Sequence, residues 1–281
     1  IRLLKDTHQI AVLSRGYKRK TKGFIVVDDS HTASDVGDEP LQFFRKFHPD
    51  ITVAVDVDRT HGIRELLGLS IEPNLILLDD AFQHRKVQAG YYILLTKYDD
   101  LYVDDYMLPT GNLRENKGGS RRADCIVVTK CPVTISKNEQ NQITKKLLLE
   151  KNQEVFFTGI NYDEHLKGVP SIHLEALQDT KILLVTGIAS PLSLITYMNS
   201  KGIDFKHLEF PDHHHFSESD LKNIKTTFDT FNTESKLLLT TEKDYVRLYK
   251  HFPQLSYIAI RSEFISDESK FINNIKEFTR M

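Results

Sequence analysis

The stretch LILLDDAFQH, residues 75–84, joins four apolar residues to two adjacent acids. A short apolar run bounded by polar residues is typical of a strand buried in a parallel sheet. Asp79 and Asp80 follow that run directly. Two neighbouring carboxylates repel each other, and they are costly near an apolar interior unless a cation or a hydrogen-bond donor compensates them. The stretch therefore predicts a strand that ends in a polar site.

Similar apolar, β-branched runs recur through the first half of the chain. They cover residues 10–13, 24–27, 51–55, 91–95 and 126–128. Helix-like segments at residues 40–47 and 59–69 lie between them. Strands that alternate with helices predict an α/β fold, with a parallel sheet and crossover helices.

A second series of runs follows a polar, helix-like segment at residues 137–151. Its expected strands are residues 155–157, 182–186, 237–239 and 257–260, and its expected helices are residues 191–199, 218–228 and 269–278. A length of 281 residues also favours two domains over one. We predict an N-terminal domain over residues 1–150 and a smaller α/β domain over residues 151–281.

The composition excludes several classes of protein. With 40% hydrophobic and 27% charged residues the chain is globular, and a net charge of -2 argues against a nucleic-acid-binding surface. The two cysteines, Cys125 and Cys131, are too few for a disulfide framework, which favours a reducing compartment. The sequence has no apolar run long enough for a membrane-spanning helix and no signal peptide.

Polar residues follow several of the expected strands. Ligands of open parallel sheets bind beyond the carboxyl ends of the strands. We therefore expect one shared rim that carries residues 14–17, 79–80, 129–130 and 240–244.

Carboxylates at this rim have two interpretations. Asp79 and Asp80 suit either a magnesium ion beside phosphates or the cap of the next helix. Asp38 and Glu39 precede Pro40, a residue that suits the first turn of a helix, so they too could be caps. Asp38 is also a candidate base for a sugar hydroxyl that attacks a phosphoryl group.

Two further segments carry reactive side chains. FPDHHHF, residues 210–216, places three histidines on a loop, where they could bind a metal, act through hydrogen bonds or form a surface cluster without a role. LPTGNLRE, residues 108–115, contains Arg114 and is followed by Arg121 and Arg122. Guanidinium groups match phosphate oxygens, although a solvated loop would explain the segment equally well.

Taken together, these motifs resemble the tetraacyldisaccharide 4'-kinase family, whose members phosphorylate the disaccharide precursor of lipid A. The matching stretches are VLSRGYKR (12–19), VGDEP (36–40), LLDDAFQH (77–84), LPTGNLRE (108–115), RRADCIVVTK (121–130), FPDHHHF (210–216) and TTEKD (240–244). The resemblance implies a P-loop NTPase-like, mostly parallel sheet with helices on both faces and a smaller C-terminal α/β domain. It also implies transfer of the γ-phosphate of ATP, with Mg²⁺, to the 4'-hydroxyl of a lipid-linked glucosamine disaccharide.

The resemblance also implies roles for individual residues. Asp38 would be the catalytic carboxylate, His213 its partner from the second domain, and Arg114 a ligand of the phosphates. Mg²⁺ would be held by Glu39, Asp79 and Asp80, the nucleotide by Thr129 and Lys130, and the substrate by Ser14, Arg15, Gly16, Tyr17, Gln83 and His84.

The family's phosphate-binding element, G-x-x-x-x-G-K-[ST], does not occur in this sequence. We expect it, with a membrane-associated helix, upstream of Ile1, and we expect the 281-residue chain alone to be inactive. The resemblance further implies a monomer at the cytoplasmic face of the bacterial inner membrane. Lys18, Arg19, Lys20 and Lys22 could attract anionic lipid there.

Two alternative functions come from other classes. A metal-dependent phosphoesterase would use Asp56, Asp58 and Asp79 with residues 212–214 as a two-metal site. A binding protein would keep the site for the lipid-linked disaccharide without catalysing a reaction.

Overall fold

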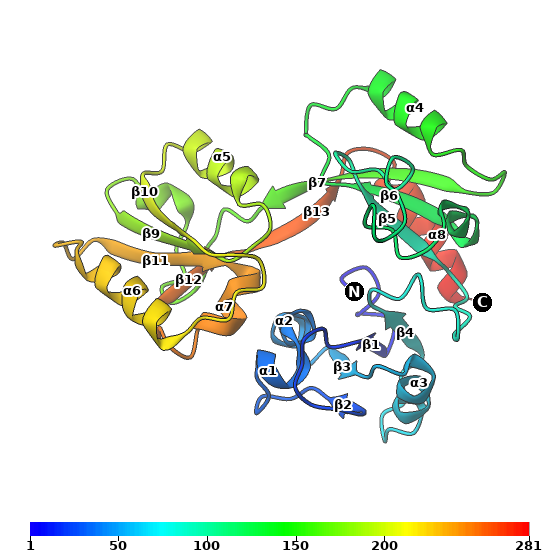
Figure 1. Ribbon diagram of the computed structural model, residues 1–281, viewed down its shortest axis with the longest axis horizontal. Helices are drawn as coiled ribbons and strands as arrows, with labels where there is room; N and C mark the ends of the chain where they lie inside the picture. The colour runs from blue at the N-terminus through cyan, green and yellow to red at the C-terminus, as the bar shows by residue number, and fades with distance from the viewer. Residues whose placement is uncertain (281) are drawn as a thin grey trace.

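The computed structural model describes residues 1–280, which form three sheets with helices packed against them (Figure 1). The first sheet has the order β2-β3-β1-β4 and contains β1 (Ile10–Ser14), β2 (Ile25–Val26), β3 (Ile51–Val55) and β4 (Leu75–Leu78). Strands β3, β1 and β4 are parallel, and the short β2 is antiparallel. The predicted apolar runs are thus neighbouring strands, and β1 is buried throughout.

Helices cover both faces of this sheet, as predicted. Helices α1 (Ala33–Val36) and α2 (Asp38–Phe47) pack on the face that carries Ile10 and Val12. Helix α3 (Arg59–Leu67) packs on the opposite face, against Ala11 and Leu13. This arrangement follows from the alternation of side chains along a strand, since residues 10–13 of β1 meet an apolar layer on each face of the sheet.

The second sheet, β13-β7-β6-β5, contains β5 (Ile93–Lys97), β6 (Cys125–Thr129), β7 (Glu154–Tyr162) and β13 (Ile260–Phe264). Strands β5, β6 and β7 are parallel, whereas β13 runs antiparallel to β7. The 3₁₀ helix η1 (Lys117–Arg122) and helices α4 (Lys137–Lys146) and α8 (Glu268–Arg280) belong to this part of the chain. Phe156 of β7 packs edge-on against Phe271, which fixes α8 to the sheet.

The third sheet has the order β10-β9-β11-β12-β8. Its strands are β8 (Lys167–Gly168), β9 (Lys181–Thr186), β10 (Phe205–Glu209), β11 (Lys236–Thr241) and β12 (Leu255–Ile258). Its helices are η2 (Leu174–Leu177), α5 (Leu192–Ser200), α6 (Glu218–Asp229) and α7 (Glu242–Leu248). All pairings are parallel except that of β8 with β12.

The antiparallel pair β7 and β13 connects the second sheet to the third (Figure 1). The expected single strand over residues 257–260 is wrong, because β12 ends at Ile258 in the third sheet and β13 begins at Ile260 in the second. Sheets alone do not define folding units, so the domain boundary at residue 150 stays a prediction. Within residues 1–280, no helix has the length and apolar character that crossing a membrane requires.

Candidate active site

The polar strand ends lie on three sheets. Ser14 ends β1 and Asp79 follows β4, which are neighbours in the first sheet, but Thr129 ends β6 and Thr241 ends β11. The expectation that one sheet carries all these strand ends is therefore wrong, because the strand series is divided among separate sheets. Thr129 donates its hydroxyl to the carbonyl of Thr96, 3.2 Å away.

An acidic group gathers at the end of β4. The hydroxyl of Ser14 donates to Oδ2 of Asp79 at 3.0 Å. Burial raises the pKa of Asp79, and the charges of Asp80 and Glu39 raise it further, although the Ser14 hydrogen bond acts in the opposite direction. The three predicted metal-binding carboxylates thus lie close enough to influence one another electrostatically.

Arg59 supplies the cation that the adjacent acids require. Its side chain is 2% exposed, and Nη2 donates to the backbone carbonyl of Asp79 at 3.1 Å while Nη1 donates to the carbonyl of Asp56. Burial lowers the pKa of Arg59, whereas the charges of Asp79 and Asp80 raise it. The sequence analysis missed this residue. An arginine in the first turn of a helix is ordinarily on the surface, and only its position after an acid-rich strand end, Asp56 to Asp58, could have indicated burial.

Arg114 comes to the same strand end from a distant loop. Its Nη1 lies 3.1 Å from Oδ2 of Asp80, a residue with a left-handed φ of 44°. Gln83 donates to the carbonyl of Asp80 at 3.2 Å and stabilises this turn, whereas Nδ1 of His84 is buried without a partner among the described residues. The loop of residues 108–115, for which the sequence allows either a phosphate site or a solvated loop, therefore reaches the acidic end of β4.

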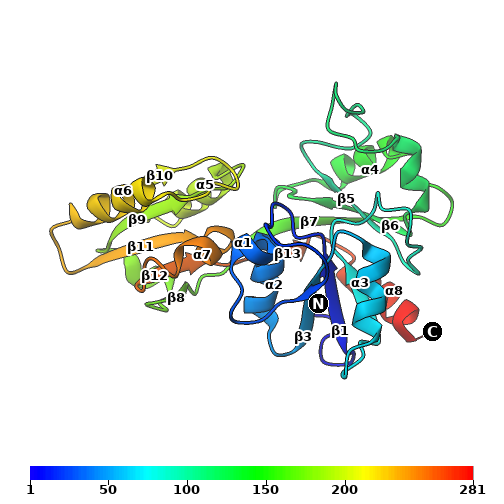
Figure 2. The same cartoon turned by 60° about the horizontal axis from the view of Figure 1, so that its bottom comes forward.

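Asp38, the first residue of α2, contacts two side chains from the C-terminal part of the chain. Nδ1 of His213 lies 3.0 Å from Oδ2 of Asp38. Arg247 of α7 donates to both carboxylate oxygens, with Nε 2.8 Å from Oδ1. Burial alone would raise the pKa of Asp38, but the hydrogen bonds from Arg247 and His213 bring it below its usual value. Figures 1 and 2 both show α7 beside α2.

The loop after β1 lies against the start of α2. Gly16 and Gly37, with φ of 69° and 94°, pack so closely that a Cβ on Gly37 would be 3.1 Å from the Cα of Gly16. The next side chain, Tyr17, is exposed. Its ring packs edge-on against that of His213, with 5.7 Å between the ring centroids. Arg15 is exposed as well. The predicted substrate-binding segment 14–17 thus connects the acidic strand end to Asp38.

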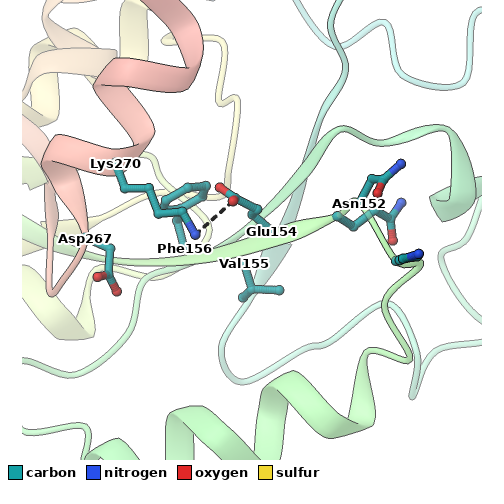
Figure 3. A pocket seen from close by; sticks show the side chains of 8 residues that line it. Asn152, Glu154, Val155, Phe156, Asp267 and Lys270 are labelled. Carbon is teal, nitrogen blue, oxygen red and sulfur yellow. Dashed lines mark ion pairs between the residues drawn. The ribbon is translucent and has the colours of Figure 1, made fainter.

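Thr129 and Lys130 lie apart from these contacts. Lys130 has a left-handed φ of 58° after β6, and within residues 1–280 neither residue hydrogen bonds to another predicted site residue. A surface cavity of about 390 Å³ between β7 and α8 is also separate, and it is bordered by the ion pair of Lys270 with Glu154 at 2.8 Å (Figure 3).

The positions of Glu39, Asp79 and Asp80 can be compared with what a bound metal ion requires. In the described part of the chain, no three histidine, cysteine, aspartate or glutamate side chains gather in a way that could hold a metal ion. Asp56, one ligand of the alternative two-metal site, instead pairs with His61 at 2.7 Å. Mg²⁺ usually needs only one or two carboxylates together with substrate phosphates, and Asp79 with its acidic neighbours fits that requirement.

A parallel α/β fold, an acidic strand end reached by arginine and a carboxylate paired with histidine together fit a phosphotransferase. The chain belongs to the LpxK family, tetraacyldisaccharide-1-P 4'-kinase, whose model matches residues 1–280.

Curated relatives and a solved structure agree with this family. The tetraacyldisaccharide 4'-kinase of Flavobacterium johnsoniae is 47% identical over 100% of this chain and 81% of its own length. That of Bacteroides thetaiotaomicron is 45% identical over 91% of this chain and 70% of its own. A crystal structure of LpxK from Aquifex aeolicus in complex with ATP matches with a TM-score of 0.74 at 26% identity, covering 99% of this chain and 81% of that one.

These matches confirm the predicted α/β fold, the kinase activity on the lipid A precursor and ATP as phosphoryl donor. The family does not support the alternative of a metal-dependent phosphoesterase.

Proposed function

We propose that Asp38 is the base of this 4'-kinase and accepts the proton of the 4'-hydroxyl as that oxygen attacks the γ-phosphate of ATP. The observation that carries the proposal is the 3.0 Å contact between Asp38 Oδ2 and His213 Nδ1, two residues 175 positions apart. A histidine that donates to a carboxylate fixes its orientation, and its positive form can stabilise the anion. Because His213 comes from the C-terminal part, bringing the two parts together completes the base.

The remaining predicted residues receive roles around this base. Glu39, Asp79 and Asp80 would hold Mg²⁺, which when bound neutralises charge on the phosphates. Arg114 is drawn to the same position by Asp80, at 3.1 Å, and would turn its fork toward the phosphate oxygens. Thr129 and Lys130 would contact the nucleotide, and Ser14, Arg15, Gly16, Tyr17, Gln83 and His84 the disaccharide.

We also propose that the kinase acts as a monomer at the cytoplasmic face of the bacterial inner membrane. Lys18, Lys20 and Lys22 are exposed and suit an anionic lipid surface. Arg19 is occupied differently, since its Nη2 donates to the carbonyl of Gly23 at 2.6 Å. Reversing the three lysine charges should weaken sedimentation with phosphatidylglycerol vesicles. Unchanged sedimentation would remove them from the proposed membrane contact.

The proposed base is tested in the full-length protein. Asp38→Asn or His213→Ala should lower kcat for transfer of labelled phosphate from ATP to the disaccharide lipid by roughly 10²- to 10⁴-fold, the usual contribution of a general base, while ATP still binds. Asp50→Asn is the matched control, because Asp50 pairs with Lys5 at 2.6 Å on the surface. Full turnover in both variants would disprove the base.

A further inference from the structure

The motif TTEKD, residues 240–244, has no role in the scheme above, and it begins helix α7. The first turn of α7 is firmly held. The Thr241 hydroxyl donates to Asp244 Oδ2 at 2.7 Å, and the same carboxylate accepts the backbone N–H of Gly187 at 2.9 Å. Asp244 is completely buried. The first turn of α7 is therefore fixed to the end of β9, and the backbone that carries its outward side chains is held in place.

Two of those side chains reach the Asp38–His213 pair. Lys243 and Arg247 are four residues apart, and this spacing places them on one face of a helix. Lys243 Nζ lies 3.1 Å from His213 Nε2 and 3.0 Å from Asp212 Oδ1. Arg247 Nε lies 2.8 Å from Asp38 Oδ1, and its Nη2 donates to the other oxygen. One helix face thus contacts both members of the pair.

Arg247 is placed to orient a protein group and not to bind phosphate. Its side chain is only 9% exposed. Besides the two bonds to Asp38, its Nη1 donates to the backbone carbonyl of His214 at 3.3 Å and lies 3.4 Å from Asp244 Oδ1. All three guanidinium nitrogens therefore have partners within the protein. A bidentate pair restricts the rotation of a carboxylate more than a single hydrogen bond does.

Lys243 and Asp38 together determine which nitrogen of His213 carries the proton. An ammonium group only donates hydrogen bonds, so Nε2 of a neutral His213 must accept from Lys243. The ring proton then resides on Nδ1, which donates to Asp38 Oδ2 at 3.0 Å, a closer contact than the 3.3 Å from Nδ1 to Arg247 Nη2. Lys243 is held by an ion pair with Asp212, whose Oδ1 lies 3.0 Å from Nζ. The lysine thereby reinforces the tautomer that the contact with Asp38 requires.

We infer that Lys243 and Arg247 are positioning residues for the phosphoryl transfer: Arg247 fixes the orientation of the Asp38 carboxylate, and Lys243 reinforces the tautomer of His213 that donates to Asp38. This inference rests on the proposed role of Asp38. It gives the TTEKD segment a function, since Thr241 and Asp244 anchor the helix that presents both cations. It also explains why the carboxylate of Asp38 is held by an arginine from the C-terminal part of the chain, Arg247.

Activity measurements test the arginine in the full-length protein. Arg247→Met should lower kcat about 10- to 100-fold, a loss typical of a misplaced catalytic group, with KM for ATP within about twofold. Arg247→Lys should recover part of the loss, because it keeps the charge but not the fork.

Arg45→Met is the matched control for the contact between α2 and α7. Arg45 stacks on the ring of Tyr249 with its guanidinium carbon 4.0 Å from the centroid and does not touch Asp38. It should keep kcat within about twofold of the parent protein. An equal loss in Arg45→Met and Arg247→Met would overturn the positioning role in favour of simple docking.

A spectroscopic readout tests the lysine independently of turnover. In protein labelled with ¹⁵N-histidine, the parent should show His213 with its proton on Nδ1, and Lys243→Met should shift it toward the other tautomer. Unchanged ring shifts in Lys243→Met, or full kcat in Arg247→Met, would refute the inference. If Asp38→Asn is inactive while Arg247→Met is fully active, the positioning role is disproved and the proposed base is not. If Asp38→Asn is active, the proposed base itself is disproved.

Discussion

The Ser14 hydroxyl lies 3.0 Å from Oδ2 of Asp79, and this bond connects the carboxyl ends of β1 and β4. The register of the two parallel strands aligns Leu13 with Leu78, so the next residues of each strand meet. The pairing of apolar runs thus places a hydroxyl donor beside a partly buried acid. The bond opposes the rise in the pKa of Asp79 that burial causes at this strand end.

Replacement of Ser14 should therefore alter the pH dependence of the kinase. Burial already raises the pKa of Asp79, and Ser14→Ala removes the bond that lowers it, so the pKa should rise further. The neutral carboxyl then persists to higher pH, and the loss of kcat/KM should be larger on the acidic side of the profile than on the alkaline side. We expect a loss of roughly 10- to 150-fold at the acidic end, the value of a hydrogen bond to a charged group.

The pH–rate profile of the full-length protein measures this effect. Ser14→Thr keeps the hydroxyl and should follow the parent profile. Parallel profiles for Ser14→Ala and the parent, displaced equally at all pH values, would contradict the link to Asp79.

Arg59 should contribute strongly to stability. Arg59→Met leaves the carbonyls of Asp56 and Asp79 without their donor and removes the cation beneath the acids. We expect the free energy of unfolding to drop by about 2 to 4 kcal/mol, as found when buried polar partners are lost. Denaturant unfolding measures the change. Arg64→Met, at an exposed position of the same helix, should change it by less than about 0.5 kcal/mol.

The fold was predictable where the local pattern and the tertiary environment agree. Strand β3 occupies residues 51–55 as predicted, because an apolar run that is buried on both faces leaves a clear signal. The expected strand at residues 257–260 failed at Ala259, where the chain leaves one sheet for another without a turn residue. Strand β10, Phe205–Glu209, was missed because only Phe205 and Leu208 of its five residues are apolar, which leaves no clear strand pattern.

The site was predictable only in part, for a similar reason. Acids at the end of an apolar run are visible in sequence, and so is a run of three histidines. The roles of Arg59 and Arg247 depend on contacts with Asp79 and with Asp38, which lies 209 residues from Arg247. A single arginine on a helix looks like solvated surface until the partner helix or strand is known.

Lys46 should stabilise the contact between α2 and α7. Its Nζ lies 2.6 Å from Oε1 of Glu242, a carboxylate that is 8% exposed. Lys46→Met leaves that charge buried and unpaired, and we expect a loss of about 2 to 3 kcal/mol in the free energy of unfolding. The double variant Lys46→Met with Glu242→Leu should recover most of the loss, since an apolar pair replaces the ion pair. Additive losses in the double variant would show that the two residues are not coupled.

Asp220 should make the stability of the protein depend on pH in the acidic range. Hydrogen bonds from the Ser217 hydroxyl and backbone, with one from His214, lower the pKa of Asp220 from 3.8 to about 2. A depressed pKa means that the stabilisation is fully present above the unfolded-state value and is lost as the pH falls through the folded-state value. The free energy of unfolding of Asp220→Asn should therefore lie below that of the parent between pH 5 and 8, and the difference should shrink to nothing as the pH approaches about 2. Glu218→Gln is the matched control, because it changes a carboxylate in the same first turn of α6 that accepts none of these bonds. A gap between Asp220→Asn and the parent that stays constant down to the acid limit would mean that the Ser217 bonds do not act on the ionised form.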